Sequence, residues 1–497
     1  MDQNYPAQNN QPQQQPPAQN QAQPPVPPQS PPVGDVPIDI PPPGSPIKKI
    51  LLLVGTLIGI LSIVALTFFY IVPKITGPKE PENVELVYWG VWDDEDVFKE
   101  IVTEFEKENP HINIKYELQE VSKLNDYVPR LQTRIDEGTG PDIFRFHNSM
   151  VRQLVTGSNI YLLSLPDDLV KKSGLSEEFY PVIQDEMKVG GAFYGIPQYI
   201  DTLVLFVNDD IFKDTGYDYP TEWGYFLDLS RSLTVVEGDG NTRKIVRPGA
   251  AMGVYDNIEH AEDIISLLML QSGIDTENFT EAERVADIAG VLEYYTCFAK
   301  STASCEPVWD NAQQNSKLAF ATGKLPMYFG YGYDLFEILA VNPEMNIKVL
   351  PVPRLGDNRS TVASYWAEGI SSKTSHAQEA YKFLEFLTSR ENMQISFANQ
   401  TKLYGFGGAY PRDDMANLLS SNNYLSSIVE QAPNAKPFYY YSNTFDGAKN
   451  QSLSKAIADA ISSIINDGTT VETAATTLVQ QTADIVGLTL PTPENEE

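Results

Sequence analysis

Residues 84–116, VELVYWGVWDDEDVFKEIVTEFEKENPHINIKY, decide the fold. The stretch opens with a β-branched and aromatic run, 84–89, which predicts a buried strand. Apolar residues then recur every fourth position over 97–105, as on one face of a helix, and Asn109-Pro110 ends that helix. Apolar residues alternate again over 112–118, which predicts a second strand. This order is one βαβ unit, so we expect two parallel strands and a right-handed crossover.

Four acidic residues, 93–96, stand at the start of the predicted helix. Carboxylates in a first turn complement the helix dipole and cap its free N–H groups. A calcium loop would need a more regular ligand spacing. We therefore interpret the cluster as capping.

The same alternation of strands and helices continues to the C-terminus. Short apolar runs predict strands at 142–146, 193–196, 203–207 and 347–350. Helical patterns cover 263–270, 378–387 and 453–465, and Thr469 with Glu472 fits a capping box for a last helix through about 486. Alternating elements of this kind predict an α/β fold.

An uncharged run of 23 residues, 50–72, precedes the βαβ unit. As a helix it would be roughly 34 Å long, enough for a bilayer core of about 30 Å. A cleaved signal peptide has a shorter apolar core and an A-x-A-like site, and a buried helix of a soluble domain rarely lacks charge over such a length. We interpret the run as an uncleaved transmembrane signal-anchor.

The residues before the anchor have a different composition. Residues 1–46 hold 15 of the 36 prolines and 10 glutamines, and no Lys or Arg. Such a segment cannot bury enough apolar surface to offset its ordering entropy, so we expect a disordered tail with polyproline II character. It is either a plain solvated cytoplasmic tail or a docking segment for proline-recognising domains.

The net charge lies entirely beyond the anchor. The chain has 35 Lys+Arg and 66 Asp+Glu, a formal charge of -31, whereas the charges of residues 1–75 sum to zero. Nucleic-acid binding requires a basic footprint, so the acidic exterior part argues against that function and against docking on anionic lipid.

Aromatic and polar residues gather in the loops that we expect near the carboxyl ends of the strands, where open α/β sheets bind ligands. Aromatic rings stack on the apolar faces of a sugar, and carboxylates and amides bond its hydroxyls. Each ring alone is more often a core residue than a site residue, but their concentration in glycine-flanked loops gives a binding site equal weight with core packing. The candidate ligand-binding residues are Trp92, Asp93, His147, Asn148, Tyr199, Asp201, Tyr331, Tyr333, Trp366 and Glu368.

Other chemistry is sparse. The two cysteines, Cys297 and Cys305, form either a disulfide in an oxidising exterior or two reduced thiols. The sequence has no HExxH, P-loop or G-x-S-x-G motif, so we expect no metal, no cofactor and no catalytic residues. A glycosidase carboxylate pair of Asp201 and Glu368 stays open, because sequence does not measure their separation.

Several stretches together resemble the family 1 extracellular solute-binding proteins, the maltodextrin-binding-like sugar receptors of bacterial ABC importers. The most specific is GAFYGIPQYIDTLVLFVNDDIF, followed by Pro220-Thr-Glu-Trp223. The others, besides 84–116, are GPDIFRFHNSMVRQLVTGSNIYLLSL, KLAFATGKLPMYFGYGYDL, IKVLPVPR, EGISSKTSHAQEAYKFLEFLTSREN and INDGTTVETAATTLVQQTADI. The likeness covers about 84–488, and it rests on the order and spacing of these pieces.

The resemblance implies a two-lobed periplasmic-binding-protein-like fold of type II, which closes around its ligand at a hinge. Lobe 1 would hold 84–199 and 357–425, and lobe 2 would hold 200–356 and 426–488. The tail 1–46, the anchor segment 47–75, the linker 76–83 and a disordered C-terminus 489–497 complete the chain. The family's ligand contacts fall in the loops that hold the candidate residues, and Tyr439, Tyr440 and Tyr441 also become candidates.

The function implied is that of a receptor that captures a sugar or oligosaccharide and delivers it to an ABC permease, without being an enzyme. The chain departs from the family in its anchor, since members are usually free or held by a lipidated cysteine. We expect a single-pass protein of the cell membrane, with a cytoplasmic N-terminus and an extracytoplasmic binding domain. A surface carbohydrate sensor or adhesin that signals through its tail is the alternative, and a glycan-acting enzyme ranks below it.

Overall fold

The computed structural model describes residues 46–71, 82–157, 159–239, 242–446 and 448–490. The chain divides into two compact units, Met1–Glu80 and Pro81–Glu497. The predicted tail 1–46 lies outside the described residues except for Pro46. Most of the predicted linker and of the predicted C-terminal disorder lies outside them as well.

The first unit contains one long apolar helix. It consists of α1, Pro46–Leu66, and a π-helical continuation η1, Thr67–Ile71. Within it, Lys49–Tyr70 is the one stretch among the described residues long and apolar enough to cross a membrane, and its side chains are exposed. Its 22 residues measure roughly 33 Å, which matches a bilayer core.

The predicted βαβ unit is confirmed. Strand β1, Val84–Gly90, runs parallel to β2, Ile112–Leu118, and helix α3, Glu95–Glu108, connects them. The buried face of α3 holds Val97, Phe98, Ile101 and Phe105, the periodic residues of the sequence. Asp94 accepts a hydrogen bond from the N–H of Asp96 and caps the helix, as expected for the acidic cluster.

The βαβ unit belongs to a five-stranded sheet with the order β2-β1-β3-β14-β6. Its other strands are β3, Ile143–His147; β14, Trp366–Ile370; and β6, Ile196–Pro197. Strand β3 is parallel to β1, whereas β14 is antiparallel to β3 and to β6. The β3–β14 register sets Trp366 opposite His147 and Glu368 opposite Arg145, so the candidate residues of two distant segments are neighbours.

Two three-stranded sheets make up most of the remaining strand structure. One has the order β11-β8-β12, from Met327–Gly330, Val204–Asn208 and Ile347–Leu350. The other, which we call the connecting sheet, has the order β15-β13-β7, from Ala435–Lys436, Thr361–Ser364 and Asp201–Thr202. Strand β13 leads into β14 of the five-stranded sheet, and β7 leads into β8. The connecting sheet therefore lies where the chain passes between the five-stranded sheet and the β11-β8-β12 sheet. The predicted lobe boundaries stay a prediction.

Two short hairpins complete the strands: β4, Lys188–Val189, with β5, Ala192–Phe193; and β9, Val235–Glu237, with β10, Lys244–Arg247. The predicted strand 193–196 is thus two separate strands, β5 and β6, because Tyr194 and Gly195 turn the chain from one sheet to another.

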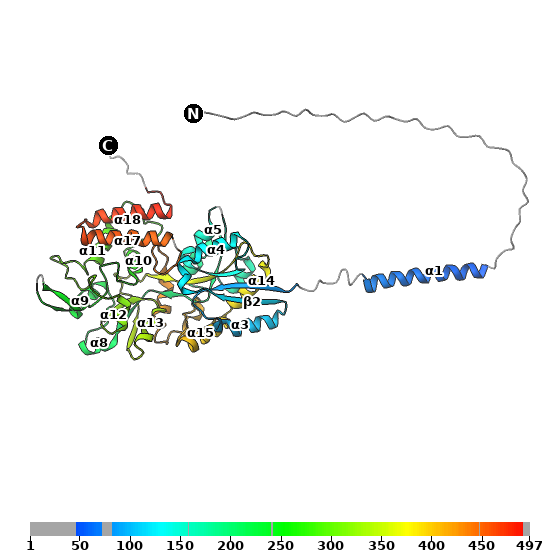
Figure 1. Ribbon diagram of the computed structural model, residues 1–497, viewed down its shortest axis with the longest axis horizontal. Helices are drawn as coiled ribbons and strands as arrows, with labels where there is room; N and C mark the ends of the chain where they lie inside the picture. The colour runs from blue at the N-terminus through cyan, green and yellow to red at the C-terminus, as the bar shows by residue number, and fades with distance from the viewer. Residues whose placement is uncertain (1–45, 72–81, 158, 240–241, 447, 491–497) are drawn as a thin grey trace, which may run out of the picture. The chain divides into compact units, whose positions relative to one another are not determined.

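Helices surround both larger sheets, and Figure 1 places α3 and α14 beside the five-stranded sheet and α8, α9 and α10 in the other half. The helices not yet given are α4 Tyr127–Asp136, α5 Val151–Val155, α6 Asp167–Ser173, α7 Pro181–Glu186, α8 Asp209–Thr215, α9 Trp223–Leu233, α10 Ala261–Gln271, α11 Arg284–Thr296, α12 Ser316–Ala321, α13 Asp334–Val341, α14 Ala377–Leu387, α15 Arg390–Tyr404, α16 Ser426–Gln431, α17 Lys449–Asn466 and α18 Val471–Val486. The 3₁₀ turns are η2 Val121–Asp126, η3 Asn148–Met150, η5 Asp413–Leu418 and η6 Ala432–Asn434.

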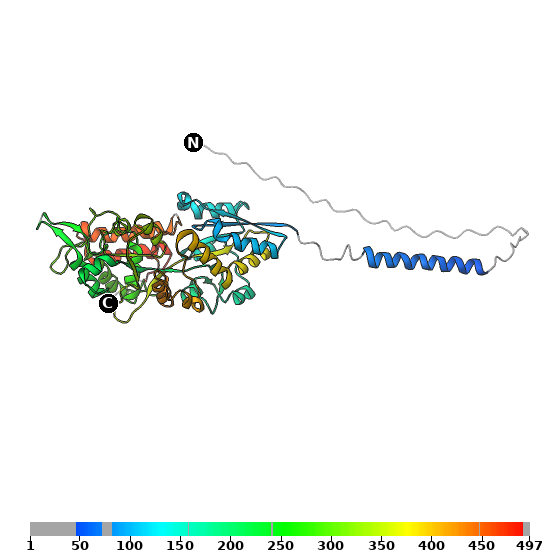
Figure 2. The ribbon, with the colours of Figure 1, turned by 90° about the horizontal axis from the view of Figure 1, so that it is seen from below.

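The last two helices lie side by side in both ribbon views and pack with α11 (Figures 1 and 2). The prediction of Thr469 as the cap of the last helix is wrong. The Thr470 side chain accepts a hydrogen bond from the N–H of Thr473, because the helix begins one residue later than the capping-box spacing indicated.

Just beyond α11, Cys297 and Cys305 form a disulfide.

Candidate functional site

Aromatic rings from separate segments meet beside the ends of β1, β3 and β14. The Trp92 ring lies 6.1 Å from Trp366 and 5.5 Å from Phe445, measured between centroids. His147 lies 5.4 Å from Trp366 and 5.5 Å from Tyr441. We call these five residues the tryptophan cluster. Trp92 is 39% exposed and Trp366 is buried, so Trp92 is the more accessible of the two tryptophans.

A second group of rings comes from the loop between β11 and α13. Tyr331 and Tyr333 are stacked with centroids 5.5 Å apart and planes 13° apart. Tyr331 is buried, whereas Tyr333 is 37% exposed. The Asn443 side-chain amide donates to the Tyr333 hydroxyl over 3.4 Å. Because Asn443 is two residues from Phe445, the segment 441–445 connects this tyrosine pair to the tryptophan cluster.

The backbone at these rings is strained. Among the described residues, the non-glycine residues with positive φ are Trp92 at 74°, Asn443 at 55° and Phe445 at 56°. Such conformations cost of order 1–3 kcal/mol each and persist only where the surroundings enforce them. All three lie in or beside the ring groups, which points to a functional rather than a purely structural site.

An ion cluster around Arg145 lies behind the tryptophan cluster. The buried guanidinium contacts Asp93 Oδ2 at 2.6 Å and Glu368 Oε1 at 2.7 Å, and the Tyr199 hydroxyl lies 3.1 Å from its Nη1. Burial lowers the pKa of Arg145, but the interactions with Tyr199, Glu368, Tyr88 and Asp93 outweigh this effect, and the net direction is upward. Burial raises the pKa of Glu368, and the Arg145 charge offsets this only in part. Asp93, Tyr199 and Glu368 are thus engaged with Arg145.

A second ion cluster lies behind the tyrosine pair. His260 is buried, with Nε2 2.7 Å from Asp334 Oδ2 and Nδ1 2.7 Å from the Ser442 hydroxyl. Lys317 approaches Asp334 Oδ1 at 3.4 Å, and the Tyr331 hydroxyl donates to Asp263 over 2.8 Å. Burial alone would lower the pKa of His260, but the charge of Asp334, the hydrogen bond to it and the nearby carboxylate of Asp263 raise the pKa to about 10.

Two carboxylates beside the rings have raised pKa values. Burial raises the pKa of Glu186 to about 7, against hydrogen bonds from Asn148 and Tyr365. Burial likewise raises the pKa of Asp201 to about 7, although the backbone N–H groups of Thr202 and Tyr333 donate to it.

His147 is neutral at physiological pH, since burial lowers its pKa to about 3. Its ring nitrogens lie 2.8 Å from the Ser149 hydroxyl and 3.0 Å from the Ser364 hydroxyl. The imidazole therefore contributes a fixed, uncharged ring to the tryptophan cluster.

The structure thus sorts the ten candidate residues into groups. Trp92, His147 and Trp366 share the tryptophan cluster, and Asn148 bonds Glu186 and lies 3.4 Å from the Tyr441 hydroxyl. Tyr331, Tyr333 and Asp201 lie together around the loop after β11. Asp93, Tyr199 and Glu368 surround Arg145 behind the rings.

Sequence reasoning missed Arg145, Glu186, His260, Asn443 and Phe445. Arg145 stood inside a predicted strand, where a charge between aromatic residues signals a buried partner. Nothing in the sequence marked the positive φ angles, because neither Asn443 nor Phe445 is a glycine.

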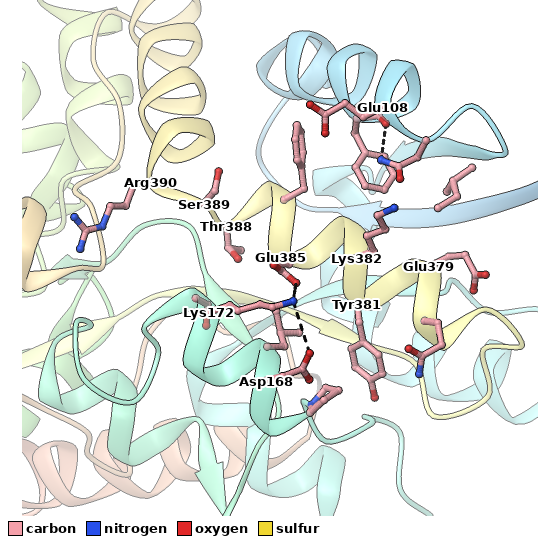
Figure 3. A pocket seen from close by; sticks show the side chains of 18 of the residues that line it. Glu108, Asp168, Lys172, Glu379, Tyr381, Lys382, Glu385, Thr388, Ser389 and Arg390 are labelled. Atoms are coloured by element: carbon pink, nitrogen blue, oxygen red, sulfur yellow. Dashed lines mark hydrogen bonds and ion pairs between the residues drawn. The ribbon is translucent and has the colours of Figure 1, made fainter.

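A separate hollow of about 990 Å³ lies on α3, α6 and α14, away from the rings. Figure 3 shows its charged lining, in which Lys172 lies between Asp168 and Glu385 at 3.7 and 3.3 Å. None of the ring residues lines it. The hollow is therefore separate from the two ring groups.

Residues 92–394 match the family described as bacterial extracellular solute-binding protein. The matched region starts at Trp92 and includes most of the site. The chain belongs to this family. The solute-binding protein is 24% identical over 356 residues to the multiple sugar-binding protein of Streptococcus mutans, an alignment that covers 68% of this chain and 79% of the relative.

Two solved structures are similar to the solute-binding protein in fold. A cyclo/maltodextrin-binding protein complexed with maltotetraose has 17% identity and a TM-score of 0.61, covering 82% of this chain and 99% of that one. The sugar-binding protein MalE from Xanthomonas citri has 18% identity and a TM-score of 0.62, covering 81% and 97%. The α/β fold is therefore the two-lobed, type II periplasmic-binding-protein fold, and the predicted fold class is confirmed.

Proposed function

We propose that the protein is an extracytoplasmic receptor for a neutral sugar or oligosaccharide. The observation that carries this proposal is the pair of exposed rings, Trp92 and Tyr333, held on loops that follow two different sheets. Rings of this kind stack on the apolar face of a sugar ring. Apolar walls with a few fixed polar groups are the usual make-up of a small-molecule site.

The charges around the rings favour an uncharged ligand. Arg145 is engaged with Asp93 and Glu368, and His260 with Asp334. A charged ligand would have to compete with these short internal pairs, which are costly to break. A neutral polyhydroxyl ligand needs only ring faces and exposed hydrogen-bonding groups such as the side chain of Asn443.

The relatives support the same ligand class. One bears the name multiple sugar-binding protein, another is named galactooligosaccharide-binding protein, and a structural neighbour holds maltotetraose. These ligands define the panel with which to begin.

The receptor works by closure of its two lobes, with the ligand stabilising the closed state. Phe336 on α13 stacks on Phe406, after α15, with centroids 4.2 Å apart and planes 3° apart. Trp92 also contacts Phe445 across the predicted boundary, with the two rings tilted by 54° and their centroids 5.5 Å apart. These ring contacts join segments assigned to different lobes, so they form on closure and separate on opening.

The chain is held at the cell membrane by 50–72, with residues 1–46 in the cytoplasm, and it delivers its ligand to the transmembrane subunits of an ABC permease. The exposed apolar helix Lys49–Tyr70 supports the anchor. Orientation is tested with an Asn4→Cys variant, which a membrane-impermeant maleimide should label only after lysis. Co-purification of a signalling kinase in place of a permease would favour a carbohydrate sensor instead.

The proposal assigns binding and no catalysis. A glycosidase needs two carboxyl groups free to flank the scissile bond. Glu368 is fully buried and bonds Arg145, Tyr88 and Gln198, which argues against its acting as the partner of Asp201.

Thermal-shift measurements on the full chain in detergent test the ligand class. Maltotetraose, a galactooligosaccharide and mannotriose form the sugar panel, and a dipeptide and putrescine are the charged controls. A shift with at least one sugar and none with the controls is expected. Shifts only with the charged compounds would overturn the sugar assignment.

A further inference from the structure

One buried guanidinium holds both ends of the turn that presents Trp92. Arg145 Nη1 donates to the Val91 carbonyl oxygen over 2.8 Å and pairs with Asp93 Oδ2 at 2.6 Å. The N–H of Asp93 also donates to the Val91 oxygen over 3.0 Å. With φ at 74° on the central Trp92, this is a γ-turn of the rare, strained kind. The contacts of Arg145 thus lie on either side of the strained residue.

The same guanidinium is tied to the strand that begins with Trp366. Its Nε donates to Glu368 Oε1 over 2.7 Å, and its Nη2 lies 2.7 Å from the same oxygen. Glu368 stands directly opposite Arg145 in the β3–β14 register, just as Trp366 stands opposite His147. Residues two apart on a strand share a face of the sheet. The Arg145–Glu368 pair therefore lies on the same face as the Trp366–His147 pair, one step further from the end of β3.

Protein contacts satisfy three of the four carboxylate oxygens of Asp93 and Glu368, and among the described residues Glu368 Oε2 has no hydrogen-bond partner. Asp93 Oδ1 accepts from Gln400 over 2.9 Å, and its backbone oxygen accepts from the Tyr116 hydroxyl over 2.6 Å. A buried ion cluster adds little net stability compared with apolar packing. A planar fork of five donors, however, fixes the geometry of everything it bonds.

We propose that Arg145 is the positioning residue of the tryptophan cluster: it locks the γ-turn that presents Trp92 and, through Glu368, aligns that turn with Trp366. It acts through these residues and does not touch the solute. The effect on solute affinity rests on the proposed function, whereas the effect on the two rings does not.

Fluorine NMR on the full chain in detergent micelles, labelled with 5-fluorotryptophan, tests the proposal. The sequence has five tryptophans, and single Trp→Phe variants assign their signals. In Arg145→Lys, a single ammonium group replaces the planar guanidinium, and it cannot bond Val91, Asp93 and Glu368 at the same time with the same geometry. The Trp92 and Trp366 signals should move, and those of Trp223 and Trp309, on other elements, should stay.

Arg412→Lys is the matched control. Arg412 is also a buried arginine, and it bonds Glu178 and Asp414. This variant should leave the Trp92 and Trp366 signals in place. Any sugar that the wild type binds should bind Arg145→Lys about tenfold more weakly, a loss of about 1.4 kcal/mol, and Arg412→Lys with unchanged affinity.

Unchanged Trp92 and Trp366 signals in Arg145→Lys would overturn the proposal, as would an equal shift of all five signals, which would indicate a general structural role. If Arg145→Lys does not fold, the variant Asp93→Asn takes its place. In this variant the Trp92 signal should move, while the Trp223 and Trp309 signals stay. An unmoved Trp92 signal overturns the proposal. If the wild type binds no sugar, the proposed function fails, but the fluorine signals still decide the role of Arg145.

Discussion

His260 Nε2 lies 2.7 Å from Asp334 Oδ2, with both side chains completely buried. The pair stands behind Tyr331 and Tyr333, whose rings lie 5.2 and 6.1 Å from the imidazole. Removing His260 takes away the hydrogen-bonded cation of the buried Asp334 and leaves only Lys317, 3.4 Å from Oδ1, to balance its charge. We expect His260→Gln to lower the free energy of unfolding by about 3–5 kcal/mol in urea titrations. His111→Gln, on a half-buried histidine outside the cluster, should change it little; an equal loss there would contradict this account.

The same pair gives stability a pH dependence. Folding raises the pKa of His260 from 6.5 to about 10, so the folded state holds this proton more tightly than the unfolded chain. The stability that His260 contributes is fully present below pH 6.5 and is lost as the pH rises toward 10. The stability gap between wild type and His260→Gln should shrink over this range. A constant gap would mean that the imidazole is neutral in the folded protein.

Glu186 should also make the protein less stable as the pH rises, but over a lower pH range than His260. Its pKa rises from 4.5 to about 7 on folding, so the folded state binds the proton more tightly and stability falls between these values. Glu186→Gln removes this titration and keeps one acceptor for Asn148 and Tyr365. Relative to wild type, the variant should gain stability as the pH rises from 4.5 to 7. Urea titrations at both pH values measure the difference, and a pH-independent difference would refute the assignment.

The fold was largely predictable because its signals are local. The apolar periodicity of 84–116 gave the parallel βαβ unit, and the acidic first turn gave the cap at Asp94. Trp92 and His147 could be named as site candidates because predicted strands end just before them, whereas Trp366 was expected in a loop and is the first residue of β14.

The remainder of the site depends on contacts between distant segments. Glu368 looked like a ligand contact, but the β3–β14 register sets it against Arg145, and a single sequence does not reveal that register. The strained turn at Trp92 likewise exists because Arg145, far along the chain, holds its two ends.

Trp92 offers a test of that strain. Glycine adopts a positive φ without steric cost, whereas alanine does not. In urea titrations, the free energy of unfolding of Trp92→Gly should therefore exceed that of Trp92→Ala by about 1 kcal/mol, although both variants lack the ring. If alanine is the more stable replacement, the turn is not strained as described.

The disulfide closes a short loop beside α11, with a sequence separation of eight between Cys297 and Cys305. Constraining the unfolded chain over so short a loop contributes about 2–3 kcal/mol. Replacing both cysteines by serine should lower the unfolding free energy by that amount and leave sugar affinity unchanged. An affinity loss would place this loop in the binding mechanism.

The central claim, that Trp92 and Tyr333 form a sugar-binding surface, is tested most directly by calorimetric titration of the full chain with the sugar that gives the largest thermal shift. Trp92→Ala should lose at least about 2 kcal/mol of binding free energy, as expected of a hot-spot tryptophan, and Tyr333→Ala should also weaken binding. Tyr225→Ala, which removes an equally exposed ring (39%) on α9, should bind like wild type. Wild-type affinity in Trp92→Ala and Tyr333→Ala would contradict the account.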